Sequence, residues 1–265
     1  MILLLPRKRR IIRGYNIKKS IAQELECWYA DFCRSPIHVR EFIEHDPVQF
    51  PRRYTKRADI EIAAFLTATI AWGRRDLIIR SAKKMFSLME PSPSAFVMAG
   101  YYRKLKDRCV CRTFFEGDLK YFCKGFKSCY AKYGSLEKLF ASGADIWQGI
   151  GLFREEMAAA NKGRYSKHIA DPGTADRAGS ACKRINLALR WLVRKGPVDM
   201  GLWKSITPAT LYIPLDLHVA RTSRRLGLLE RKSNDKKAVI ELTEKLRGFC
   251  PEDPVKYDFA LFEMS

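Results

Sequence analysis

Hydrophobic positions recur at steps of three and four residues almost everywhere from residue 21 onward. No window shows the sustained alternation of apolar and polar residues that marks a half-buried strand, so the pattern predicts an all-α fold. The most apolar segment is residues 59–72, DIEIAAFLTATIAW, which is hydrophobic nearly all round. We expect a central buried helix here, capped by Asp59 and ended by Gly73.

Two further helices are expected in the first half of the chain. One runs through residues 77–89 and stops at the sequence EPSPS. The other ends at Gly134, and its apolar stripe consists of Leu119, Phe122, Cys123, Phe126 and Tyr130. Its opposite face carries Lys120, Lys124 and Lys127. We interpret these three lysines as a solvated face.

The second half of the chain begins with a long loop. Residues 161–179 lack periodicity and are rich in Gly, Pro, Asp and Asn, and a loop of this length in a compact domain is often functional. It leads to a helix over 180–195 that Ser180 caps, with a buried stripe of Ile185, Ala188, Leu189 and Leu192. The remaining expected helices are a short one opened by Thr207-Pro208, one from Asp216 to Gly227, one over 236–247, and a last one opened by Asp253-Pro254.

Charge changes the picture more than any other bulk property. The 265 residues carry 49 Lys and Arg against 29 Asp and Glu, which gives a net charge of +20 and a pI near 9.7. Such a charge is typical of a protein that binds a polyanion, because each phosphate that the protein neutralises releases counterions and strengthens binding. A basic surface that serves solubility, or attraction to anionic lipid, is the alternative. We favour nucleic acid.

The organisation expected from the chain is simple. Residues 1–20 hold seven basic residues and no acid, which indicates a mobile arm, and residues 21–265 form a single all-α domain. We expect no membrane span and a monomer in the cytoplasm, associated with the nucleoid. The eight cysteines show no zinc-ribbon spacing, and Cys109-Val-Cys111 is a weak metal signal. We therefore expect reduced thiols, no metal and no cofactor.

The stretch IPLDLHVARTSRRLGLL pairs an acid with a run of arginines. Arg221, Arg224 and Arg225 stand at i, i+3 and i+4, so they share one helix face, where a phosphate backbone would relieve their mutual repulsion. A solvated basic face is the other interpretation. Asp216 is a preferred N-cap residue, and a carboxylate fixed at a helix start can also activate a nucleophile or stabilise a developing cation.

Lys183 is the candidate nucleophile. It lies in the first turn of the expected 180–195 helix, next to Arg184, and both the helix macrodipole and that neighbour disfavour a protonated amine. A neutral amine is the form that attacks carbon. The competing interpretation is that Lys183 is one more surface lysine among many.

These residues resemble known families. The stretch IPLDLHVARTSRRLGLL resembles the aspartate motif of helix-hairpin-helix DNA glycosylases, and AGSACKRINLALR is similar to that family's hairpin and following helix in a degenerate form. The 33 residues between Lys183 and Asp216 resemble the wider spacing of the archaeal 8-oxoguanine DNA glycosylase branch. From about residue 37 onward the chain more closely resembles a bacterial family known only as a domain of unknown function (2400).

The resemblance implies a base-excision repair enzyme that acts on damaged double-stranded DNA. Lys183 would attack the glycosidic carbon of a flipped nucleotide and form a Schiff base that permits β-lyase activity, and Asp216 would activate it. Gly179, Ser180 and the head of the following helix would hold a phosphate, Arg184 and the three arginines would contact DNA, and Trp72 and Arg74 are candidates for the base pocket. Ala181 replaces the second hairpin glycine, and no iron–sulfur cluster is expected.

We therefore predict an all-α, helix-hairpin-helix glycosylase-like protein that removes a damaged base, an oxidised purine. The alternative is a non-catalytic DNA- or RNA-binding protein of the same fold. A structural or adaptor protein whose charge is incidental is the third interpretation.

Overall fold

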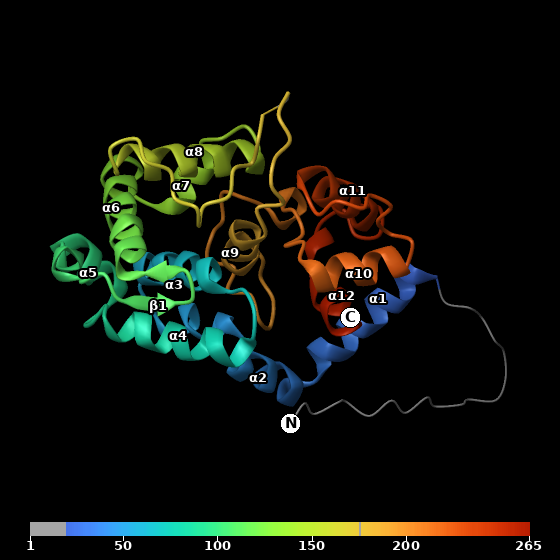
Figure 1. Ribbon diagram of the computed structural model, residues 1–265. Coiled ribbons are helices and arrows are strands. Elements are labelled where there is room, and N and C mark those ends of the chain that lie inside the picture. The colour runs from blue at the N-terminus through green and yellow to red at the C-terminus, as the bar shows by residue number, and fades with distance from the viewer. Residues whose placement is uncertain (1–19, 175) are drawn as a thin grey trace.

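The computed structural model describes residues 20–174 and 176–265, and Figure 1 shows that its regular elements are mostly helices, joined by several long loops. The all-α prediction is confirmed at this level. The exception within the described residues is a two-stranded antiparallel hairpin, β1 (Cys109–Cys111) and β2 (Phe114–Phe115), which the hydrophobic pattern did not indicate. The arm expected over 1–20 lies outside the described residues except for Ser20, which caps the first helix. None of the helices described is both long and apolar enough to cross a membrane.

The most apolar segment forms the central helix, α3 (Arg57–Ile70), which is buried from Asp59 to its end. The prediction that Asp59 caps it was wrong, because α3 begins two residues earlier and Lys56 occupies the N-cap position. The Asp59 carboxylate instead accepts a 2.7 Å hydrogen bond from the backbone N–H of Ser94, in the first turn of α5 (Pro93–Ala99). The acid therefore joins two helices.

One group of helices packs around α3 through a core of aromatic rings (Figure 1). Its members are α4 (Arg75–Ser87), α5, the hairpin, α6 (Glu116–Tyr133), α7 (Leu136–Ala141) and α8 (Ile146–Ala159). Phe65 of α3 lies within 5.5 Å, centroid to centroid, of both Phe140 and Phe153. Gly134 ends α6 in the left-handed conformation, at φ +78°, as the pattern predicted.

The lysine face of α6 differs from the prediction. Lys120 donates a hydrogen bond to the Leu105 carbonyl, and Lys127 donates one to the Met98 carbonyl. Both side chains therefore attach the segment before the hairpin to α6. Lys124 alone of the three is exposed to solvent.

A second group of helices lies on the other side of the molecule (Figure 1). It comprises α1 (Ile21–Arg34), α10 (Leu217–Arg225), α11 (Lys236–Arg247) and α12 (Asp258–Glu263), with α2 (Pro36–His45) joining it to the first group. Short 3-10 helices complete the chain at Pro47–Gln49, Pro51–Arg53, Tyr101–Lys104, Pro208–Thr210 and Pro254–Tyr257. The helix expected over 236–247 and the cap at Asp216 are confirmed.

Helix α9 (Lys183–Val193) runs between the two groups. Its buried stripe is as predicted, and the described residues between α8 and α9 contain no helix. Ser180 does not cap α9, because the helix begins three residues later, after Cys182 in the left-handed conformation at φ +46°. Ser180 forms an antiparallel bridge with Asp235 instead. The correction moves Lys183 to the first residue of the helix.

Candidate functional site

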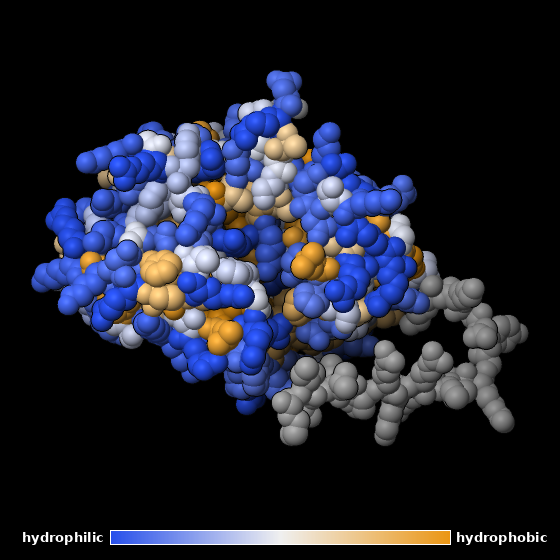
Figure 2. Space-filling view, viewed as in Figure 1, coloured by the Kyte–Doolittle hydropathy of each residue, from blue (hydrophilic) through white to orange (hydrophobic). Residues whose placement is uncertain are grey.

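A cleft of about 940 Å³ lies between the two groups of helices, with α9 at its base. Figure 2 shows the hydrophilic surface interrupted along the furrow between them, where hydrophobic side chains lie. Residues from α2, the α3–α4 turn, α9, the start of α10 and α12 line it. The volume is near the upper end of the range for small-molecule sites, so the cleft can take a group as large as a nucleotide base.

Lys183 and Asp216 meet in the lining of this cleft. Lys183 Nζ lies 3.8 Å from Asp216 Oδ2 and donates a 3.1 Å hydrogen bond to the carbonyl of Ala71, at the end of α3. The side chains are 28 % and 21 % exposed respectively, so both are largely buried in the lining of the cleft. The fold thus brings together the two candidates from segments 33 residues apart.

The two oxygens of Asp216 have separate partners. Oδ1 accepts hydrogen bonds from the backbone N–H groups of His218 and Val219, each at 2.9 Å, and so caps α10. Oδ2 is the oxygen that faces Lys183. A helix cap fixes the carboxylate in place while one oxygen stays available for the lysine, so capping and chemistry do not compete at this residue.

The position of Lys183 depends on a tight crossing of the loop before α9. A Cβ atom on Gly179 would lie 1.9 Å from the carbonyl oxygen of Pro172, so only glycine fits there. Ser180 N–H donates to the Asp171 carbonyl at 2.8 Å, and the Gly179 carbonyl accepts from Lys236 N–H at 3.0 Å. These contacts fix the chain immediately before the lysine.

Aromatic side chains make up much of the cleft wall. They are Phe42, Trp72, Trp191, Phe259 and Phe262. The Arg112 guanidinium, from the turn of the β1–β2 hairpin, lies over the Trp72 ring, and Arg75 lies 5.3 Å from the Phe262 centroid. Arg74 is exposed at the rim and pairs with Asp76. The wall therefore combines flat apolar surfaces with guanidinium groups, which suits a planar, polar heterocycle.

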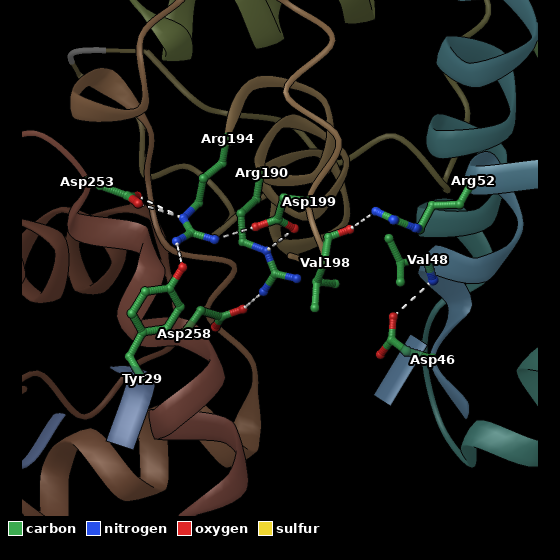
Figure 3. A network of polar contacts seen from close by, with 10 residues as sticks. All are labelled: Tyr29, Asp46, Val48, Arg52, Arg190, Arg194, Val198, Asp199, Asp253 and Asp258. Atoms are coloured by element: carbon green, nitrogen blue, oxygen red, sulfur yellow. Dashed lines mark hydrogen bonds and ion pairs between the residues drawn. The ribbon is translucent and has the colours of Figure 1, made fainter. Parts of the chain in front are cut away.

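A buried ion network supports the base of the cleft (Figure 3). Arg190 pairs with Asp258 and lies 3.3 Å from Asp199, while Arg194 pairs with Asp199 and Asp253 at 2.8 Å each. Burial raises the pKa of Asp258 to about 6, although Arg190 opposes the shift. The network joins α9 to α12, and it reaches α1 because Arg194 also donates to the Tyr29 hydroxyl.

The comparisons with known proteins give a single match. Residues 46–265 match the family model described as Protein of unknown function (DUF2400). The chain belongs to this family. No curated protein and no solved structure is significantly similar to it. The expected resemblance to a domain family of unknown function is thereby confirmed, and Lys183, Asp216 and Asp258 all lie within the matched part of this DUF2400 protein.

The arginines proposed to contact DNA have different surroundings in the DUF2400 protein. Arg221 is exposed. Arg224 donates to the carbonyls of Arg231 and Lys232 and to the Asn234 side chain. Arg225 donates to the Met264 carbonyl. Of the three, Arg221 is the one whose guanidinium has no hydrogen-bond acceptor among the described residues.

Arg184 is also engaged within the protein. Its guanidinium lies 3.4 Å from the carbonyls of Thr69 and His168, and burial lowers its pKa. It therefore connects α3 to the long loop behind Lys183. Ser180 likewise uses its N–H within the protein. At the start of α9, the backbone N–H groups of Lys183, Arg184 and Ile185 have no acceptor among the described residues.

Sequence reasoning missed several residues of the cleft. Asp46, Trp191 and Asp258 were not singled out, although each lines it. One signal was available: Arg190 falls on the buried side of α9, and a charge in that position requires buried partners of opposite sign. Its partner Asp258 lies 68 residues away, so the pairing itself depends on the tertiary fold.

Proposed function

We propose that this DUF2400 protein binds double-stranded DNA and excises a damaged base, an oxidised purine, with Lys183 as the nucleophile and Asp216 as its activating carboxylate. The observation that carries the proposal is the 3.8 Å approach of Lys183 Nζ to Asp216 Oδ2 in the lining of a cleft large enough for a base. We further propose that the fold is glycosylase-like, with a degenerate hairpin at 179–182, and that the protein acts as a monomer at the nucleoid.

The chemistry requires an amine next to a carboxylate. The neutral Lys183 amine would donate its lone pair to C1′ of a nucleotide flipped into the cleft, and the bond from C1′ to the base would break with its electron pair leaving on the base. The base would then take up a proton. Opening of the sugar ring would convert the C1′ adduct into an imine, from which β-elimination can cleave the strand.

Asp216 would serve this reaction in two ways. Oδ2 lies 3.8 Å from Lys183 Nζ, an ion-pair distance that would have to shorten when substrate binds for Oδ2 to receive the proton before attack. The carboxylate charge would also stabilise the positive charge that develops on the sugar. Because Oδ1 is held by two backbone N–H groups, the carboxylate is already in position before substrate arrives. Such preorganisation is the usual source of electrostatic catalysis.

The charge distribution supports a nucleic-acid ligand. The net charge of +20 favours a polyanion, and Arg74 and Arg221 are exposed. The backbone N–H groups of Lys183, Arg184 and Ile185 at the start of α9 would donate hydrogen bonds to a phosphate next to the reacting sugar. A phosphate bound there would place its nucleotide beside Lys183.

Borohydride trapping tests the proposal. The purified protein is incubated with labelled duplexes, each carrying 8-oxoguanine, an oxidised pyrimidine, uracil or an abasic site, and the imine is reduced to a stable adduct. We expect an adduct with one lesion for the wild type and none for Lys183→Gln. Lys124→Gln, on the exposed face of α6, is the matched control and should trap normally.

The trapping result distinguishes a base-excision enzyme from a protein that only binds nucleic acid. An adduct that requires Lys183 supports the excision mechanism and names the lesion. Absence of an adduct with every duplex, together with tight and salt-sensitive binding, would contradict the lysine mechanism. That result would favour the alternative, a non-catalytic DNA- or RNA-binding protein, once base release without strand cleavage had also been tested.

A further inference from the structure

Arg112 presents a guanidinium group at the rim of the cleft. The residue lies in the turn between β1 and β2 and is exposed, and its guanidinium carbon lies over the ring of Trp72, which lines the cleft. None of the N–H groups of this guanidinium donates to an acceptor among the described residues. An arginine side chain carries five such donors, so the group can bind an anion that approaches the cleft from solvent.

The charge of Arg112 is not neutralised by a neighbouring acid. No carboxylate among the described residues forms an ion pair with it. Asp76, in the first turn of α4, pairs with two arginines of its own segment. Glu116, the first residue of α6, pairs with Arg108, and Asp118 accepts a hydrogen bond from the backbone N–H that precedes α6. An external anion would therefore meet a full positive charge at this point of the rim.

The hairpin that carries Arg112 is fixed to the helices beside it (Figure 1). Lys84 of α4 donates a 2.6 Å hydrogen bond to the carbonyl of Cys109 in β1. Phe114 of β2 is fully buried, with its ring centroid 5.9 Å from that of Phe122 in α6. The backbone of the turn is held from two sides, so its position does not have to be acquired when a ligand binds.

Gly73 makes room for the guanidinium. A Cβ atom at position 73 would lie 2.0 Å from Nη1 of Arg112, so a larger residue would displace this group from the Trp72 ring. An arginine that is already held against an aromatic ring loses less conformational freedom on binding. Its N–H donors can then bind the two non-bridging oxygens of a phosphodiester in parallel.

The same turn anchors the candidate nucleophile. Lys183 donates to the carbonyl of Ala71, and Trp72 is the next residue along the chain. Consecutive Cα atoms are about 3.8 Å apart, so the amine and the guanidinium contact neighbouring residues of the α3–α4 turn. A strand that presents one sugar to Lys183 would bring an adjoining phosphate to this rim. A small free anion would gain the phosphate contact alone.

We propose that Arg112 binds a backbone phosphate of the nucleic-acid strand that enters the cleft, and that Trp72 and Gly73 are positioning residues that hold its guanidinium for this contact. The inference rests on the proposed function only in taking the ligand to be DNA. Arg112 belongs to the first group of helices and Arg221 to the second, on the other side of the cleft. Phosphate contacts at both would lay the strand across its mouth.

Fluorescence anisotropy with a labelled duplex tests the phosphate contact. The duplex carries a tetrahydrofuran analogue of an abasic site, which has no leaving group at C1′, so binding is measured without turnover. Arg112→Gln should bind about tenfold more weakly at roughly 0.1 M salt and reduce the slope of log affinity against log salt by about 1. Lys124→Gln removes one exposed charge from α6 and should leave affinity and slope close to those of the wild type.

Two further variants keep the charge and change only its placement. Arg112→Lys replaces the planar fork with a single ammonium group, and Gly73→Ala displaces the guanidinium from the Trp72 ring. Each should weaken duplex binding at least about threefold. Gly134→Ala introduces alanine at a similar positive φ of +78°, with no atom within 4 Å, and should bind like the wild type. Thermal unfolding of the same samples verifies that each variant is folded.

Several results would overturn the proposal. They are a wild-type salt slope in Arg112→Gln, wild-type affinity in Gly73→Ala, and equal losses in Arg112→Gln and Lys124→Gln, which would reflect net charge alone. Vesicles of phosphatidylserine and phosphatidylcholine probe lipid phosphate. Binding that depends on Arg112 for these vesicles but not for the duplex would also overturn it.

Failure of this inference is distinguishable from failure of the proposed function. The binding assay does not require Lys183, and Lys183→Gln should show the same dependence on Arg112 as the wild type. Duplex binding that depends on Arg112 without any trapped adduct would leave the phosphate site standing and reject excision. A Lys183-dependent adduct with a wild-type salt slope in Arg112→Gln would do the reverse.

Discussion

The Arg112 guanidinium carbon lies 4.2 Å from the centroid of the Trp72 ring, so the turn of the β1–β2 hairpin covers one wall of the cleft. Arg112 adopts a left-handed conformation at φ +54°. Gly73, next to the tryptophan, also has a positive φ of +91°, and a Cβ there would lie 2.0 Å from Nη1 of Arg112. The stacking therefore depends on glycine at position 73.

Gly73→Ala is expected to displace the Arg112 side chain and change Trp72 emission toward that of Arg112→Ala. The free energy of unfolding should fall by about 1–2 kcal/mol, because an L-residue with positive φ is strained. Urea unfolding and fluorescence spectra measure the two effects. Gly134→Ala has the same backbone strain, at φ +78°, with no atom within 4 Å, so it should lose similar stability with an unchanged spectrum. Identical spectra for Gly73→Ala and the wild type would contradict the stacking.

Asp216→Asn and Asp216→Ala should separate capping from chemistry. The asparagine side chain can still accept hydrogen bonds from the two backbone N–H groups, so the melting temperature of Asp216→Asn should match that of the wild type. Asp216→Ala should lower the free energy of unfolding by about 1 kcal/mol. Both should slow single-turnover excision by at least about 100-fold, because both remove the charge facing Lys183. Normal excision by Asp216→Asn would show that the residue is a cap alone.

Arg221→Ala and Arg224→Ala should differ although both remove one charge. Arg221 is exposed, so its loss should weaken duplex binding and reduce the slope of log affinity against log salt by about 1. Arg224 holds the 231–234 segment, so its loss should chiefly lower the melting temperature. Fluorescence anisotropy at several salt concentrations, with thermal unfolding of the same samples, measures both. Equal salt slopes for wild type and Arg221→Ala would argue against phosphate contact there.

Glu61→Ala should lower the free energy of unfolding by about 3 kcal/mol. Glu61 is fully buried in α3 and accepts hydrogen bonds from the Tyr130 hydroxyl, the Trp203 indole and the Leu136 N–H. Its removal leaves the Trp203 indole and the Leu136 N–H without an acceptor, and leaves the Tyr130 hydroxyl only the Ala58 carbonyl at 3.4 Å. Glu230→Ala removes an exposed acid that is paired with Lys245, and should change stability by less than about 0.5 kcal/mol. Chemical denaturation of both variants checks the difference.

Local sequence rules predicted the parts of the fold that local forces determine. The buried α3 helix, the Gly134 stop and the Asp216 cap each follow from residues within one or two turns. Asp59 and Ser180 were misassigned because other groups take their hydrogen bonds: the Ser94 N–H donates to the Asp59 carboxylate, and Ser180 donates its N–H to the Asp171 carbonyl while its hydroxyl accepts from the Cys182 N–H. A predicted helix cap is therefore wrong where another part of the protein forms a hydrogen bond with the capping side chain.

The candidate site was predictable in part. Lys183 and Asp216 stood out because each lies at an expected helix start, and the structure brings them together. Asp258 and Trp191 could not be assigned to the same cleft, since their approach depends on how α9 and α12 pack, and the contact of Arg112 with Trp72 depends on how the hairpin packs. The β1–β2 hairpin is too short for alternation of apolar residues to reveal it.

The α12 wall of the cleft has a consequence for biosynthesis. Asp258, Phe259 and Phe262 belong to α12, which is translated after the segments that carry Lys183 and Asp216. A nascent chain on the ribosome can therefore present the lysine and the aspartate before the cleft has its α12 wall. The cleft is complete only when α12 has been translated and has docked against α9.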